Sequence, residues 1–247
     1  MTLPVFLYQE PMSVDAFVTL SGDEGKHAAT VRRIRVGEQI ELVDGAGTRA
    51  TCVVTVVSKH ELTVRIAGVS FTQAPDLQFY VAQALAKGDR SDLALEILTE
   101  IGIDGIIPWS ATHSIAKWSD PEKGQAKWQR VVTEASKQSR RAYVPCIAPL
   151  HSTEQLLSAI GANNLAIVLH EAASESITEI TLPQAGQVLL VVGPEGGITG
   201  EEISAMKAAG AKVVRMGTSV MRTSTAGGAA LAALISQTNR WAASDQK

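Results

Sequence analysis

From residue 77 onward, apolar runs of strand length alternate with longer helical patterns, and this alternation constrains the fold more than any other feature. The strand candidates cover residues 78–84, 105–109, 165–170, 187–192 and 212–216. The helical patterns cover residues 89–101, 121–141, 153–159, 201–209 and 226–241. Alternating strands and helices are typical of a parallel sheet with helices on both faces. We therefore predict an α/β domain for this part of the chain.

The N-terminal part of the chain follows a different pattern. Its short runs alternate apolar and polar residues and are separated by turn residues; they cover residues 39–43, 49–57 and 61–66. Such runs predict a small antiparallel sheet or barrel, with one helical turn near residues 26–34. Residues 71–76 contain a proline and few apolar side chains, so the domain boundary is placed there. The predicted domains are residues 1–72 and 73–247.

Composition limits the class of protein. Of the 247 residues, 45% are hydrophobic and 19% are charged, which is the profile of an ordinary folded soluble domain. The N-terminus lacks a basic and apolar leader, and no apolar run reaches about 18 residues, so a cytoplasmic protein without a membrane span is expected. Cys52 and Cys146 lack metal-ligand spacing and are interpreted as small buried residues, so no metal is expected.

A glycine-rich turn follows an apolar strand candidate and precedes a helical pattern. The turn consists of Gly193, Pro194, Glu195, Gly196 and Gly197. Ligands gather beyond the carboxyl ends of parallel strands, where glycines let a ligand approach the backbone. A tight structural turn explains the same residues equally well. The turn is neither a phosphate loop nor GxGxxG. Thr199 and Glu202 fit a capping box that starts the next helix, and Gly210 fits its end.

Two further turns follow strand candidates of the same predicted sheet. One contains Leu169, His170 and Glu171, and the other contains Met216, Gly217, Val220, Met221 and Arg222. Three such turns from three parallel strands would line one pocket. The helix after the last turn is rich in Ala and Gly, which indicates either the close approach of another backbone or tight helix packing. Arg222 is a candidate for phosphate or base contact, or else a solvated surface charge.

The net charge of −3 gives no global signal for nucleic acid, so any such signal must be local. Residues 127–141 hold five Lys or Arg against one Glu, and Lys26, His27, Arg32, Arg33 and Arg35 form a second basic segment. Both segments could pair with a polyanion such as an RNA backbone, although a solvated face explains each of them too. His60, His113 and His151 stand in no such pattern, and no role is assigned to them.

The chain contains the motif residues of one protein family, and they follow one another in the order typical of that family. They are His27 with residues 31–33; Lys87, Gly88, Asp89 and Arg90 with residues 99–102; Glu134, Ala135, Gln138 and Arg141; residues 192–197; and residues 216–226. On these residues the sequence resembles the SPOUT methyltransferases that methylate N3 of a uridine in bacterial 16S ribosomal RNA. The glycine-rich turn in this order is highly specific.

The resemblance implies a fold and a cofactor. The fold is a PUA-like β-barrel over residues 1–72, followed over residues 73–247 by a SPOUT α/β domain whose C-terminal part forms a deep trefoil knot. A threaded backbone would account for the small side chains of the last helix. The three turns named above would hold S-adenosylmethionine mainly through backbone groups, and the protein would act as a homodimer.

The resemblance also suggests how the substrate is held. Arg222, with Arg90 and Arg141, would hold a flipped uridine and stabilise charge on the base as its N3 proton leaves. Glu195 would take that proton, or instead bond to the cofactor or to its own loop. The RNA-binding residues would be Lys26, His27, Arg32, Arg33, Lys87, Arg90 and Arg141. The expected partner is 16S ribosomal RNA within the assembled small subunit, whose shape supplies recognition.

One segment departs from the family pattern. The family commonly has a carboxylate before the Thr-Ala pair of this segment, whereas Ser224 stands there in this chain. The sequence therefore offers no acid at this position. Two other functions stay open: a methyltransferase of the same fold that acts on tRNA, against which the N-terminal barrel argues, and a non-catalytic RNA-binding protein of ribosome assembly.

Overall fold

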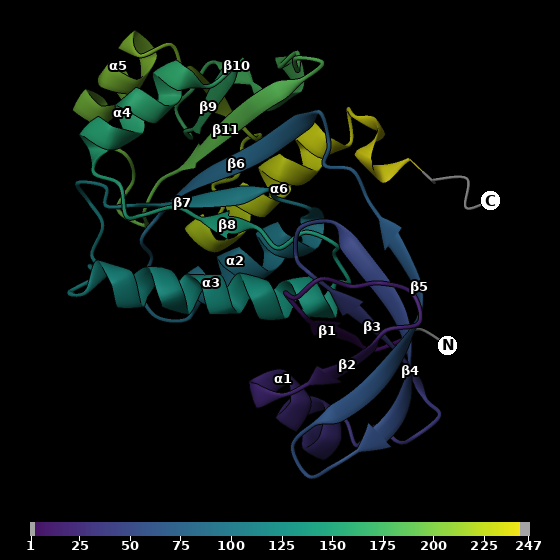
Figure 1. Ribbon diagram of the computed structural model, residues 1–247. Coiled ribbons are helices and arrows are strands. Elements are labelled where there is room, and N and C mark those ends of the chain that lie inside the picture. Colours follow the sequence, from purple (N-terminus) through teal and green to yellow (C-terminus); the bar gives the residue numbers. More distant parts are fainter. Residues whose placement is uncertain (1–2, 243–247) are drawn as a thin grey trace. The chain divides into compact units, whose positions relative to one another are not determined.

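The computed structural model describes residues 3–242, and the chain divides into two compact units (Figure 1). The N-terminal unit extends to Ala74 and also includes Ser136–Val144. The C-terminal unit contains Pro75–Ala135 and the chain from Pro145 onward. The sequence placed a boundary after residue 72 and gave no sign that a later segment returns to the first unit.

The N-terminal unit is a curled, mostly antiparallel sheet (Figure 1). Its strands are β1 (Val5–Leu7), β2 (Phe17–Leu20), β3 (Gln39–Val43), β4 (Thr48–Val57) and β5 (Leu62–Phe71), in the order β1-β3-β4-β5-β2. Among the described strands of this unit, only β1 and β3 pair in parallel. Alternate residues, among them Ile40, Cys52 and Val64, fill a buried core on one face, as the period-two pattern predicts. Helix α1 (Gly22–Lys26) and a π-helical turn (His27–Val31) supply the expected helical interruption.

Hydrogen bonds tie the returning segment to the turn between β3 and β4 and to the residue that follows β5. The Tyr143 hydroxyl donates to the Thr72 carbonyl at 2.7 Å, and the Gly47 amide donates to the Ala142 carbonyl at 3.1 Å. Lys137 forms an ion pair with Glu24, and its side chain is only 8% exposed. Part of the basic segment that the sequence offered to a polyanion is therefore used inside this unit.

The C-terminal unit contains a fully parallel sheet, which confirms the predicted α/β class. The described strands are β6 (Leu77–Ala84), β7 (Gly105–Trp109), β8 (Cys146–Ile147), β9 (Leu165–Leu169), β10 (Glu175–Ser176), β11 (Gly186–Val192) and β12 (Lys212–Arg215). Their order is β10-β12-β9-β11-β6-β7-β8. The chain thus inserts β11 between two earlier strands, β6 and β9. The trefoil knot stays a prediction of the resemblance.

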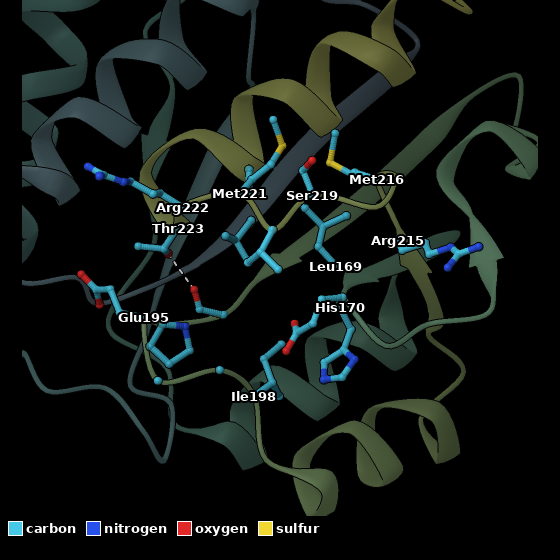
Figure 2. Close-up of a pocket in the computed structure, with 18 of the residues that line it drawn as sticks. Leu169, His170, Glu195, Ile198, Arg215, Met216, Ser219, Met221, Arg222 and Thr223 are labelled. Carbon is cyan, nitrogen blue, oxygen red and sulfur yellow. Dashed lines mark hydrogen bonds between the residues drawn. The ribbon is translucent and has the colours of Figure 1, made fainter.

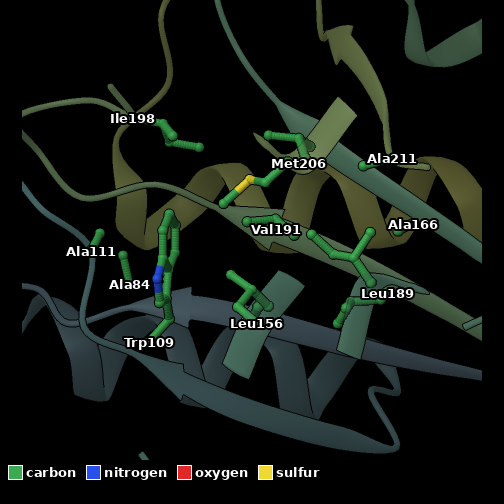
Figure 3. Packing of buried hydrophobic residues seen from close by; sticks show 13 residues of the cluster. Ala84, Trp109, Ala111, Leu156, Ala166, Leu189, Val191, Ile198, Met206 and Ala211 are labelled. Atoms are coloured by element: carbon green, nitrogen blue, oxygen red, sulfur yellow. The ribbon is translucent and has the colours of Figure 1, made fainter. Parts of the chain in front are cut away.

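Helices cover both faces of this sheet, as predicted. They are α2 (Arg90–Ile101), α3 (Pro121–Gln138), α4 (Thr153–Ala162), α5 (Gly200–Ala208) and α6 (Thr223–Ile235). On one face, Leu156 of α4 and Met206 of α5 pack against Trp109, Leu189 and Val191 of the sheet (Figure 3). On the other face, α6 packs against α2, β6 and β11. No helix within residues 3–242 is long and apolar enough to cross a membrane.

The start and end signals of α5 are confirmed. The Thr199 hydroxyl accepts from the Glu202 amide at 3.1 Å, and the Glu202 carboxylate accepts from the Thr199 amide at 3.0 Å. These reciprocal bonds satisfy two backbone donors that the first helical turn leaves free. Gly210 follows the helix with a φ of +100°, in the region that favours glycine.

The two cysteines differ from each other in exposure. Cys52 is fully buried in the N-terminal core, as predicted, and burial raises the pKa of its thiol to about 11. Cys146 is exposed, so the prediction that it is buried is wrong. Cys146 lies on β8, a two-residue strand at the edge of the sheet as described for residues 3–242.

The small residues of α6 serve close packing against α2. A methyl group placed on Gly228 would collide with the Ile97 side chain and approach Ile101 Cδ1 to 3.2 Å. Both isoleucines lie on α2. The close neighbours of Gly228 are thus side chains of the adjacent helix, which favours the packing explanation over the approach of another backbone.

Replacing Gly228 by alanine is expected to lower the free energy of unfolding by about 1–3 kcal/mol, because the added methyl overpacks the α2–α6 contact. Urea denaturation followed by circular dichroism measures this change. Gly161→Ala is the matched control, since Gly161 also lies in a helix but has open space around its Cα. That control is expected to be neutral or stabilising. Equal stability of Gly228→Ala and wild type would contradict the packing explanation.

Candidate functional site

A pocket of about 500 Å³ opens in the C-terminal unit, where β9, β11 and β12 end (Figure 2). These three strands are neighbours in the sheet, in the order β12-β9-β11. Because the strands are parallel, their carboxyl ends meet at one edge and the turns that follow them converge. The pocket lies at the edge where the sequence predicted it.

The structure brings together on this pocket wall all residues that were expected to contact a cofactor. They are Leu169, His170, Glu171, Gly193, Pro194, Glu195, Gly196, Gly197, Met216, Gly217, Val220, Met221 and Arg222. Arg90 also lines the pocket. Six further lining residues were not among the expected cofactor contacts: Val192, Ile198, Arg215, Ser219, Thr223 and Ala226. Val192 and Arg215 are the last residues of their strands and directly precede the turns.

The glycine-rich turn lines the pocket, and its backbone also requires glycine at two positions for steric reasons. A methyl group on Gly193 would lie 2.5 Å from Ile198 Cγ1, and Gly197 has a φ of +77°. The Thr223 hydroxyl donates to the Gly193 carbonyl at 2.6 Å, which ties the turn to the start of α6. Thr223 in turn accepts from Gln83 Nε2 of β6 at 3.1 Å. The turn therefore meets the structural demands of a tight turn and also lines the pocket.

Glu195 contacts the segment that follows β6. Its Oε1 accepts from Arg90 Nη1 at 3.2 Å and from the Lys87 amide at 3.3 Å. These bonds place Arg90 at the pocket, beside the glycine-rich turn. The structure thus shows Glu195 bonded to a neighbouring segment rather than to its own loop.

Arg222 precedes the first turn of α6, and its carbonyl accepts from the Thr225 and Ala226 amides. Its guanidinium makes no ion pair with any residue of the 3–242 range that the structure describes. Figure 2 shows Arg222 and Glu195 at one end of the pocket, with His170 and Arg215 at the other. The pocket thus has cationic side chains at both ends.

The segment that follows β7 contacts the outer side of the glycine-rich turn. His113, to which the sequence assigned no role, donates from Nδ1 to the Gly196 carbonyl at 3.0 Å. Thr112 donates to Glu202 Oε1 through its amide at 3.0 Å and its hydroxyl at 2.9 Å. The sequence missed these contacts because a single histidine and a threonine form no pattern.

Glu202 is a buried carboxylate with several hydrogen-bond donors. The residue is 5% exposed, and it also accepts from the Thr153 hydroxyl at 3.1 Å. Burial acts to raise its pKa, but bonds from the Thr112 and Thr199 amides and from nearby hydroxyls outweigh burial and lower the pKa. Glu202 therefore stays ionised at neutral pH and joins three segments near the pocket.

The residues expected to bind RNA fall into separate groups. In the N-terminal unit, Lys26, Arg32 and Arg33 are exposed on one segment. The His27 ring lies edge-on to the Phe6 ring, with the two ring centroids 6.1 Å apart. Arg141 is partly buried in the returning segment.

In the C-terminal unit, Lys87 and Arg90 are exposed on the segment after β6. Farther along, Lys127 of α3 is paired with Asp92 at 2.8 Å. Ser224, the residue that departs from the family pattern, is 4% exposed in the first turn of α6. This buried hydroxyl side chain cannot act as a carboxylate base.

Comparison with known families matches both parts of the chain. Residues 73–235 match a family described as an RNA methyltransferase domain. Residues 20–67 match a family described as an RNA methyltransferase PUA domain. The two matched ranges fall on either side of the predicted boundary.

Similar proteins cover nearly the whole chain. A ribosomal RNA small subunit methyltransferase E from Mycobacterium tuberculosis (strain CDC 1551 / Oshkosh) is 44% identical over 235 residues, covering 93% of this chain and 90% of the relative. The protein of the same description from Bacillus subtilis (strain 168) is 30% identical, and the match covers 89% of this chain and 90% of that protein. A crystal structure of a ribosomal RNA small subunit methyltransferase E from Neisseria gonorrhoeae, bound to S-adenosylmethionine, superposes with a TM-score of 0.88 at 30% identity. The superposition covers 96% of this chain and 98% of the Neisseria gonorrhoeae chain.

Proposed function

The chain belongs to the family of ribosomal RNA small subunit methyltransferase E enzymes, and on that premise we propose that it methylates N3 of a uridine in 16S ribosomal RNA with S-adenosylmethionine. One observation carries the proposal. Three turns that the sequence singled out, at residues 169–171, 193–197 and 216–222, line one pocket at the carboxyl ends of neighbouring parallel strands.

The pocket suits S-adenosylmethionine in size and chemistry. Its volume of about 500 Å³ falls in the range of small-molecule sites. Leu169, Ile198 and Met221 offer an apolar surface for an adenine ring, and the glycine-rich turn offers backbone groups to polar parts of the cofactor. When bound, S-adenosylmethionine supplies an activated methyl carbon, so the protein's task is alignment and control of the N3 proton.

Arg222 is the residue proposed to act on the base. Arg222 lines the pocket as the last residue of the third turn, and Arg90 lines the same pocket. Planar cations at this place would hold a flipped uridine and stabilise the negative charge that develops when the N3 proton leaves. Arg141 is proposed to contact the RNA as well.

Glu195 is proposed to position Arg90. The carboxylate is already engaged by Arg90 and by the Lys87 amide, which favours this role over transfer of the N3 proton. An isosteric Glu195→Gln change would keep the shape of the turn but remove the charge that holds Arg90.

The proposed partners are folded 16S ribosomal RNA in the small subunit and a second copy of this chain. Lys26, His27, Arg32 and Arg33 would contact the RNA backbone, because phosphate and shape dominate recognition of folded RNA. Lys87 would do the same near the pocket. Val220 and Met221 are 78% and 43% exposed, which supports a homodimer that covers the third turn.

Methyl transfer from radiolabelled S-adenosylmethionine tests the proposed function. Small subunits that lack the modification are expected to become labelled at one uridine, located by primer extension across the blocked N3 position. Label only in tRNA would favour the tRNA methyltransferase instead. Absence of label in every RNA, from protein shown to be folded, would favour a non-catalytic assembly protein. Fully modified subunits serve as the control, since they should accept no label.

A further inference from the structure

We propose that the segment after β7, residues 110–114, is a brace that holds the glycine-rich turn in its cofactor-binding shape through His113 and Glu202. The brace lies outside the set of pocket-lining residues, so it acts through the turn and touches no cofactor. The proposal rests on the proposed function, because it assigns to these residues the affinity for S-adenosylmethionine.

The first contact of the brace is made by His113. Its Nδ1 donates to the Gly196 carbonyl at 3.0 Å, and a methyl group on Gly196 would lie 2.9 Å from His113 Cβ. The turn therefore packs closely on the brace at its fourth residue. A side chain at Gly196 would displace one of the two segments, so the glycine is needed on the side away from the pocket.

The second contact passes through Glu202. Its Oε1 accepts from Thr112 of the brace and from Thr153 at the start of α4, while its Oε2 accepts from the Thr199 amide. Thr199 directly follows Ile198, whose side chain lines the pocket. The carboxylate thus connects the brace to the end of the turn where the chain enters α5.

The turn needs such support because of its composition. Glycines widen the range of backbone conformations that are open to the turn without a ligand. Ordering a loop during binding costs free energy, and contacts that fix the bound shape in advance increase affinity. Residues that never touch the cofactor can therefore set its dissociation constant.

Calorimetric titration of the full chain with S-adenosylmethionine tests the His113 contact. His113→Ala is expected to raise the dissociation constant about three- to tenfold, the effect of one lost hydrogen bond. His113→Asn is expected to restore affinity to within about twofold of wild type, because the Asn amide reproduces the Nδ1 donor. His151→Ala is the matched control, since His151 Nδ1 bonds a backbone carbonyl, that of Pro149, at 2.8 Å without lining the pocket.

Steady-state kinetics test the Glu202 contact. Glu202→Gln is expected to raise KM for S-adenosylmethionine on the order of tenfold, because the amide puts donors where a carboxylate accepted from several donors. The kcat at saturating cofactor is expected to change by less than about threefold. Glu179→Gln is the control, since Glu179 also closes a capping box but lies away from the brace.

The outcomes separate the brace from the proposed function. A wild-type chain that binds no S-adenosylmethionine would contradict both. Binding by wild type with unchanged affinity in His113→Ala would overturn the brace alone. If Glu202→Gln fails to fold, the His113 variants decide. Loss of cofactor affinity in His113→Ala and its recovery in His113→Asn would support the brace independently of Glu202.

Discussion

Replacing Arg222 by alanine is expected to lower the rate of methyl transfer at least about hundredfold while S-adenosylmethionine binds with nearly wild-type affinity. A donor aimed at charge that develops in the transition state contributes roughly 10²- to 10³-fold to the rate. The Arg222 guanidinium forms no ion pair within the described part of the chain, so its removal leaves no protein carboxylate without a partner. Single-turnover transfer to unmodified small subunits measures the rate, and calorimetry measures cofactor binding.

Two further variants sharpen this test. Arg222→Lys keeps the charge but loses the planar fork, so it is expected to recover only part of the activity. Arg215→Ala is the matched control, since Arg215 also lines the pocket but lies at its opposite end (Figure 2). Its rate is expected to fall much less. Loss of cofactor binding in Arg222→Ala would show that the arginine serves the cofactor, and the role assigned to it would be wrong.

The position of the site could be predicted because it depends on local patterns. Apolar runs of strand length identify the parallel strands, and the polar or glycine-rich residues after them identify the turns. Parallel topology then fixes which ends converge, without knowledge of any side-chain contact. For this reason Leu169, Gly193 and Met216 were placed on one pocket although they are far apart in the sequence.

The supporting contacts could not be predicted in this way. His113 meets Gly196 and Thr112 meets Glu202 only because the sheet places β7 and β11 near each other, with β6 between them. Strands β8 and β10 could not be predicted either, because each has only two residues and therefore shows no periodicity. The return of Ser136–Val144 to the N-terminal unit also depends on contacts with distant residues.

Helix α6 shows how a tertiary contact shifts a boundary. The Ala-rich pattern predicts a start at residue 226, whereas the helix begins at Thr223. The Thr223 hydroxyl bonds the Gly193 carbonyl and accepts from Gln83, so contacts with β6 and the glycine-rich turn fix this first residue in place. The expected C-terminal end also differs, because α6 stops at Ile235 and a short 3₁₀ turn, Asn239–Trp241, follows.

That 3₁₀ turn carries Arg240, which fastens the end of the described chain to the sheet. Its guanidinium donates to both oxygens of Asp104, at 2.7 and 2.9 Å, and to the Gly102 carbonyl at 2.9 Å. It also lies over the Phe79 ring, 5.6 Å from the centroid. Asp104 Oδ2 accepts from the Phe79 amide as well, at 2.8 Å. The side chains of Arg240 and Asp104 are only 15% and 12% exposed.

Replacing Asp104 by alanine is expected to lower the free energy of unfolding by about 3 kcal/mol or more, because it leaves the largely buried Arg240 charge without its partner. At roughly 2–4 °C per kcal/mol for a chain of this size, Tm should fall by about 6–12 °C in a calorimetric scan. Lys127→Ala is the matched control: Lys127 also contacts both oxygens of an aspartate, Asp92, but its side chain is 55% exposed. An exposed pair contributes less than about 1 kcal/mol, so a similar loss in both variants would contradict the burial argument. Adding Arg240→Ala to Asp104→Ala should cost less than the two single losses together, since the second change removes the unpaired charge that the first one created.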